Sequence, residues 1–294
     1  MLPLELIKLR ALMERTTGSP EVKIGLIDGP VATQHADLAG EHLHEIPGKN
    51  GATCSQANST ACLHGTFVAG ILSAKRDSLA PAICPNCTLL LRPIFTETTS
   101  GRDPMPSATP LELAAAIIAC DDAGARVINL SLALAQPSTK GELALEEALN
   151  HAVRRGVIVV AAAGNQGTLG SSPITRHPWV IPVAACDLRG RPMNQSNLGS
   201  SVGRRGLSAP GESVTSLGSE SRSFTLGGTS VAVPFVTGAI ALLWSEFPTA
   251  PAAQIKLAVT RTTTLRRASV APPLLDAEAA YQILSTANAR RRLA

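Results

Sequence analysis

The chain has 294 residues, of which 45% are hydrophobic and 16% charged, and its formal net charge is +4. This composition predicts a large buried core and excludes a mainly disordered chain. Part of the positive charge lies in arginines near the C-terminus, so it does not indicate a nucleic-acid surface, and we expect no nucleic-acid partner. No uninterrupted apolar run is long enough to cross a membrane. The first residues lack the pattern of a secretory signal, so we expect a cytoplasmic protein without a membrane partner.

The first predicted elements are an amphipathic helix over residues 4–14 and a buried strand over residues 22–28. The strand stops at Asp28, because Gly29 and Pro30 follow it. In parallel α/β sheets, ligands and catalytic groups gather at the carboxyl ends of strands, so Asp28 is placed like a functional residue. Taken alone, it is also typical of a turn or a helix cap.

A histidine follows a loop that contains cysteines. His64 precedes an apolar run of small residues that ends at Leu72, and this pattern predicts an imidazole in the first turn of a helix. A lone histidine is more often structural than catalytic. This one follows a carboxylate at a strand end, which favours a functional role.

Strands and helices alternate through the rest of the chain. Strands are expected at residues 89–95, 127–132, 157–163 and 179–185, and helices at residues 111–122, 142–154, 251–259 and 275–280. Residues 97–109 are expected to form a loop, and residues 206–211 a passage of turns. The alternation predicts an α/β fold with a mostly parallel central sheet and helices on both faces. No linker divides the chain, so we expect an N-terminal helical extension, residues 1–20, and a single domain, residues 21–294.

Two further side chains are placed where they could act on a substrate. Asn165 lies in a glycine-rich turn after a strand, where its amide could project into a cleft as an oxyanion donor or simply adopt a left-handed turn conformation. Ser230 follows two glycines and opens an apolar run. A helix N-terminus there would offer free N–H groups to a developing negative charge. The alternative is an ordinary N-cap by Ser or Thr.

Six cysteines raise the question of their pairing. Four of them, Cys54, Cys62, Cys84 and Cys87, lie within 34 positions as two local pairs, which suggests two possible disulfides. Free thiols are the main alternative. The gap between Cys54 and Cys62 fits the usual short zinc-ligand spacings poorly. We therefore expect no metal and no cofactor, and the conflict between paired cysteines and a reducing compartment stays open.

Taken together, four short blocks make the chain resemble the subtilisin-like serine proteases, the subtilases. They occur in the family's order and are Ile27-Asp28-Gly29, His64-Gly65-Thr66, Ala163-Gly164-Asn165 and Gly228-Thr229-Ser230. The aspartate precedes the histidine by 36 residues and the histidine precedes the serine by 166. The resemblance covers about residues 21–283 and implies a three-layer subtilisin-like fold.

The resemblance also implies a role for each residue. Ser230 would be the nucleophile, His64 the general base and then acid, and Asp28 the residue that orients the imidazole. Asn165 and the Ser230 N–H would bind the oxyanion. The substrate-binding residues that it suggests are Ser131, Leu132, Ala133, Gly164 and Arg176.

Several positions depart from the family pattern. Asp28 is followed directly by Gly29 and Pro30, and Leu132 and Ala133 stand where the family's Ser-x-Gly-Gly strand borders the first specificity pocket. The extra side chains should narrow or reshape access to that pocket. Our hypothesis for Arg176 is that it favours an acidic or polar residue before the scissile bond; the alternative is that it faces solvent.

A looser resemblance concerns the substrate. The compact chain, with its segment Asp28-Gly29-Pro30-Val31 and its cysteine loop, is similar to the proteases that mature ribosomally made peptides in cyanobactin-type pathways. This resemblance implies a precursor peptide cut at a short recognition sequence. The alternatives are a general intracellular protease, a catalytically silent peptide-binding module, and an acyl transferase that closes peptides into rings. The sequence does not predict the oligomeric state.

Overall fold

A central sheet of seven strands organises the protein, in a computed structural model that describes residues 2–38, 40–97, 109–132, 142–220, 222–261 and 269–292. All the neighbouring strands pair in parallel, in the order β2-β3-β1-β4-β5-β6-β7. The strands are β1 (Lys23–Asp28), β2 (Leu43–Glu45), β3 (Thr88–Pro93), β4 (Val127–Leu130), β5 (Ile158–Ala162), β6 (Ile181–Cys186) and β7 (Leu207–Pro210). The prediction of a mostly parallel sheet is confirmed.

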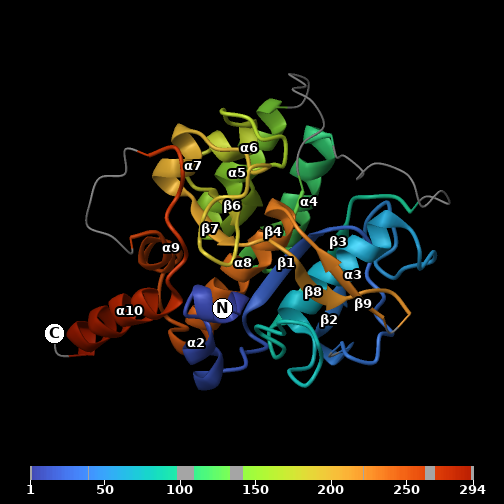
Figure 1. Ribbon diagram of the computed structural model, residues 1–294, viewed down its shortest axis with the longest axis horizontal. Helices are drawn as coiled ribbons and strands as arrows, with labels where there is room; N and C mark the ends of the chain where they lie inside the picture. The colour runs from blue at the N-terminus through green and yellow to red at the C-terminus, as the bar shows by residue number, and fades with distance from the viewer. Residues whose placement is uncertain are drawn as a thin grey trace.

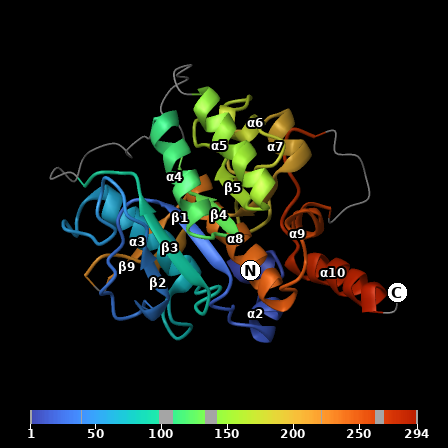
Figure 2. The same ribbon diagram turned by 180° about the vertical axis from the view of Figure 1, so that it is seen from behind.

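Helices cover both faces of this sheet. On one face lie α3 (Thr60–Ser73) and α8 (Thr229–Glu246), which Figure 1 shows in front of the strands. On the other lie α4 (Pro110–Asp122) and α5 (Glu142–Arg155), which face the viewer in Figure 2. Successive side chains of each strand point to opposite faces. Val127 accordingly packs into the core beside α8, and Ile128 into the core beside α4.

Shorter elements surround these three layers. They are α1 (Pro3–Leu6), α2 (Arg10–Arg15), the 3-10 helix η1 (Gly40–His42), α6 (Pro173–Arg176), α7 (Ser200–Arg205), the antiparallel hairpin of β8 (Val214–Leu217) and β9 (Ser223–Leu226), α9 (Ala252–Thr260) and α10 (Ala277–Arg292). Figure 1 shows α10 running outward from the body of the molecule to the C-terminus. Before it, Ser208 of β7 and Leu274 form a parallel bridge, so this segment covers the edge of the sheet.

Three sequence-based expectations about elements are wrong. The helix expected over residues 4–14 is two helices, because Lys8 adopts a positive φ of 51° between them. The turns expected at residues 206–211 contain strand β7, which is buried throughout. The closing helix expected at residues 275–280 extends instead to Arg292.

Helix α8 is apolar enough to resemble a membrane span by composition. It has 18 residues and a mean hydropathy of 1.3, but 83% of it is buried inside the fold. It packs against β4, β5, β6 and β7. Its apolar character is therefore that of the central core helix of the domain.

Candidate active site

Asp28 and His64 form a buried pair between β1 and α3. Asp28 is the last residue of β1 and is fully buried. Its Oδ1 accepts the Gly29 N–H at 2.7 Å and lies 2.7 Å from His64 Nδ1. His64 is the fifth residue of α3, so it lies in the second turn and not in the first turn as expected. The pKa of His64 is raised, because burial lowers it but the charge and the hydrogen bond of Asp28 together outweigh burial.

Two glycines let α3 approach the end of β1. A Cβ at Gly29 would lie 2.0 Å from the Ala61 carbonyl oxygen, and a Cβ at Gly65 would lie 2.3 Å from the Pro30 carbonyl oxygen. Both obstacles are backbone atoms, which cannot rotate away as a side chain can. Glycine at these two positions therefore allows the strand and the helix to bring Asp28 and His64 into contact.

Ser230 is the second residue of α8 and is half-buried. The N-cap of this helix is Gly228, with a φ of 129°, so the N-cap residue has no side chain with which to cap the first turn. The interpretation of this segment as an ordinary Ser or Thr N-cap is therefore wrong. Helices α3 and α8 pack against each other. His64 Nε2, the imidazole atom not held by Asp28, is buried and has no hydrogen-bond partner among the residues that the structure describes.

Asn165 is tied to the start of α8. Its Oδ1 accepts hydrogen bonds from the Thr229 N–H at 2.8 Å and from Thr229 Oγ1 at 3.0 Å. Thr229 Oγ1 in turn accepts the Gly164 N–H at 3.2 Å. Because Oδ1 is occupied, the orientation of the amide is fixed, and its Nδ2 donates to no described residue. A Cβ at Gly228 would approach that Nδ2 to 3.0 Å, so glycine keeps the space beside it open.

The remaining candidates are placed differently. Ser131 and Leu132 follow β4 and are both buried, and the Ser131 hydroxyl points to the Ser230 carbonyl at 2.7 Å. Ala133 lies outside the described residues. Arg176 ends α6, its side chain is 58% exposed, and it lies 3.8 Å from Glu142 on α5. The structure thus places Arg176 in an ion pair between α5 and α6, and its effect on specificity stays a prediction.

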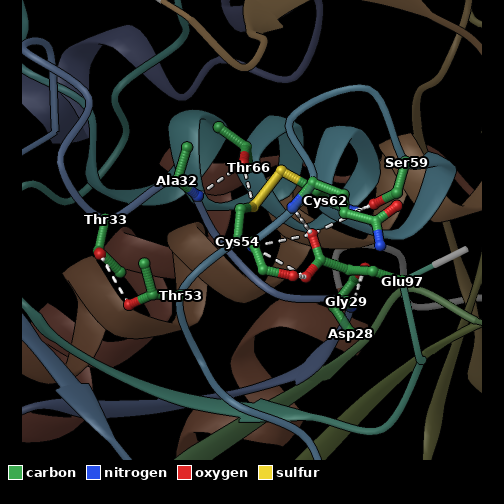
Figure 3. Close-up of a disulfide and its surroundings, with 12 residues drawn as sticks. Asp28, Gly29, Ala32, Thr33, Thr53, Cys54, Ser59, Cys62, Thr66 and Glu97 are labelled. Atoms are coloured by element: carbon green, nitrogen blue, oxygen red, sulfur yellow. Dashed lines mark hydrogen bonds between the residues drawn. A yellow bond between two sulfur atoms is a disulfide. The ribbon is translucent and has the colours of Figure 1, made fainter. Parts of the chain in front are cut away.

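A disulfide joins Cys54 to Cys62 (Figure 3), and Cys62 precedes His64 by two residues in α3. Glu97, which the sequence placed at the start of a loop, lies beside it. The carboxylate accepts hydrogen bonds from the Ser55 and Gln56 N–H groups and from the Ser55 and Ser59 hydroxyls. Burial raises the pKa of Glu97, but these hydrogen bonds outweigh burial and lower it.

The two sulfurs and one Glu97 oxygen lie within 4.8 Å of one another, which is the spacing of metal ligands. Both sulfurs are used in the disulfide, and both Glu97 oxygens already accept hydrogen bonds. The cluster therefore holds the segment before α3 in place and offers no metal site.

Cys84 and Cys87 are not joined by a disulfide. Both are free and buried, so the second suggested pair is wrong. The close spacing does bring the two thiols together, since they share a hydrogen bond that raises the pKa of Cys84. Cys120 and Cys186 are also free and buried.

Comparison with known proteins identifies the family of the chain. The model of the subtilase family matches residues 19–285. The chain belongs to the subtilase family. Subtilisin DY of Bacillus licheniformis is 31% identical over 264 residues, which are 88% of this chain and 89% of that protein.

Two solved structures resemble this subtilase in fold. A mutant of the protease domain of PatA matches with a TM-score of 0.81 and 30% identity, over 92% of this chain and 97% of that chain. The prenylagaramide maturation protease PagA matches with a TM-score of 0.79 and 27% identity, over 94% of this chain and 98% of that chain. This subtilase is accordingly a subtilisin-like serine endopeptidase, a hydrolase.

Proposed function

We propose that this subtilase hydrolyses peptide bonds with Ser230 as the nucleophile, His64 as the general base and Asp28 as the residue that orients the imidazole. The observation that carries the proposal is the 2.7 Å contact between Asp28 and His64 Nδ1, together with the free Nε2. Asp28 holds the Nδ1 proton, so Nε2 keeps its lone pair. Since α3 and α8 pack against each other, that atom can take the Ser230 proton.

The reaction follows in two halves. Ser230 Oγ attacks the scissile carbonyl while Nε2 takes its proton, and Nε2 then gives that proton to the leaving amine. Water attacks the acyl-enzyme in the second half, again losing a proton to Nε2, and Ser230 recovers its proton as the acid product leaves. The charge that develops on the carbonyl oxygen is stabilised by Asn165 Nδ2 and by the Ser230 N–H, which lies in the first turn of α8.

We further propose that the substrate is a precursor peptide, cut at a short recognition sequence. The similarity to PagA and PatA supports this, because both are described as maturation proteases. We place the reaction in the cytoplasm, where a ribosomally made precursor is produced. The Cys54–Cys62 disulfide would then persist under reducing conditions, and alkylating the free thiols in intact cells before the thiols are counted tests that point.

The test is to incubate the protein and its Ser230→Ala variant with a diverse peptide library and to locate the cuts by mass spectrometry. Cuts that are confined to one short motif and absent from the variant are expected. Broad cuts that depend on Ser230 would show a general protease instead. Cuts that persist in the variant, or no cuts at all, would contradict the proposed role of Ser230.

A further inference from the structure

The carbonyl group of the proposed nucleophile lacks its usual partner. In an α-helix each carbonyl accepts the N–H of the residue four positions later. For Ser230 that residue is Pro234, which has no N–H and whose ring presses on this carbonyl. The hydroxyl of Ser131 donates to the Ser230 carbonyl instead, at 2.7 Å. A side chain that follows β4 therefore supplies the hydrogen bond that the helix cannot make.

The Ser131 hydroxyl is itself oriented by two further side chains. Asn129 Nδ2 donates to Ser131 Oγ at 2.8 Å, which leaves the Ser131 proton to point at Ser230. Thr237 Oγ1 donates to Asn129 Oδ1 at 2.9 Å, which fixes the orientation of the amide. Each hydrogen bond thus sets the direction of the next one.

The fold explains why these groups meet. Asn129 and Ser131 are two residues apart, so both point from the β4 segment to the same face of the sheet. Thr237 follows Ser230 by seven positions, about two helical turns, so both lie on one face of α8. That face packs against β4. Asn129, Ser131 and Thr237 are fully buried, so water does not compete for these hydrogen bonds.

We propose that Thr237, Asn129 and Ser131 form a hydrogen-bonded chain that positions Ser230 for attack, which makes Ser131 a positioning residue through its hydroxyl. The inference rests on the proposed role of Ser230 as the nucleophile. Ser230 carries both the attacking Oγ and an oxyanion N–H, so a shift of its backbone misplaces both. The Ser131 hydroxyl is used in the hydrogen bond to Ser230, so its removal takes no side-chain donor from the substrate. Loss of the chain should therefore lower kcat and leave KM nearly unchanged.

The experiment measures kcat and KM on a cleaved peptide, and the rate at which Ser230 reacts with a fluorophosphonate. In Ser131→Ala we expect kcat and the fluorophosphonate rate to fall together, roughly 10- to 100-fold, as for a small misplacement of a reacting group. Thr237→Val keeps the shape of the side chain and removes only the hydroxyl, so both rates should fall less, and Thr237→Ser should restore them. The matched control is Thr286→Val on α10, where the hydroxyl bonds, among the described residues, to Gln282 of the same helix.

Pro234→Ala provides the sharpest comparison, because it returns an N–H to the Ser230 carbonyl. In that background, Ser131→Ala should lower kcat less than it does in the natural chain. Equal losses in both backgrounds, or a lower melting temperature with unchanged kcat in Thr237→Val, would overturn the inference. If the unsubstituted protein does not react with the fluorophosphonate, the proposed function fails as well. If it reacts, and the variants react at the same rate, this inference alone fails.

Discussion

In the proposed mechanism, the protonation of His64 sets the pH range in which the site can act. His64 must be neutral to accept the Ser230 proton. Its pKa lies above the ordinary value of 6.5, since burial is outweighed by Asp28. His64 therefore gains a proton as the pH falls through this raised pKa, and kcat/KM should decline with a midpoint above 6.5. Asp28→Asn should move the midpoint lower and reduce kcat about 10⁴-fold. A pH profile of kcat/KM for both proteins checks this, and an unchanged midpoint in the variant would contradict the pairing.

The same raised pKa affects stability in the opposite sense. The folded state binds the His64 proton more tightly than the unfolded state does. The resulting stabilisation is fully present below pH 6.5 and is lost as the pH rises through the raised pKa. Above this pKa, His64 is neutral and can act as a base, but it no longer adds to the free energy of unfolding. The protein is thus expected to be most active at a pH where His64 stabilises the fold least.

Single residues show which parts of the site the sequence could reveal. Short motifs single out Asp28, His64 and Ser230 as candidates, because the proposed chemistry requires those residue types. The motifs do not predict the hydrogen bond from the Ser131 hydroxyl to the Ser230 carbonyl. Pro234 is a signal for it, because proline has no N–H to give that carbonyl its partner within the helix. Glu97 had no such signal, since its hydrogen-bond donors come from a loop about 40 positions earlier in the chain.

The contact between β1 and α3 leads to a prediction about an element as a whole. A Cβ at Gly65 would meet the Pro30 carbonyl, so Gly65→Ala must push α3 away from β1 and separate His64 from Asp28. Overpacking of this kind destabilises by about 1–3 kcal/mol. We expect that loss in denaturant unfolding, together with a fall in kcat of about 100-fold, as for a misplaced catalytic group. Gly51→Ala is the control, because a Cβ there meets nothing within 4 Å. Full activity in Gly65→Ala would show that the close approach is not required.

Elements with strong local patterns were predicted well, and those defined by their neighbours were not. The buried strands β1, β3, β4 and β5 lie where their apolar runs indicated. The sequence of β7 indicates turns, because its four residues lie between two glycines, and pairing with β6 makes them a strand. The break between α1 and α2 has a tertiary cause as well. The turn at Lys8 allows Ile7 and Leu9 to be buried together.

At the scale of the whole molecule, the N-terminal helical extension shares its core with the rest of the domain. Leu12 is fully buried in the same cluster as the side chains of α8. The Arg76 guanidinium also donates to the carbonyls of Met13 and Thr16, which ties α2 to the segment after α3. The boundary at residue 20 thus separates two stretches of sequence that are packed as one unit.

This shared core can be tested by truncating one side chain. Leu12→Ala should lower the free energy of unfolding by about 2–5 kcal/mol, as for a central core leucine. Leu2→Ala is the matched control; its side chain is 55% exposed, and a change within about 0.5 kcal/mol is expected. Denaturant unfolding measures both. If the two variants were equally stable, the extension would not contribute to the core.

The four free thiols are built-in probes of local unfolding. Cys120 is a core residue of α4, Cys84 and Cys87 lie in the core beside α8, and Cys186 ends β6. None of the four is exposed. Burial raises the pKa of Cys120 and of Cys186 to about 12, so reactive thiolate is scarce until the chain opens. A thiol reagent added under native conditions, at a concentration at which labelling outpaces reclosing, would therefore label each position at the rate at which its own layer opens. The order of labelling would show which face of the sheet separates first, with no probe introduced into the chain.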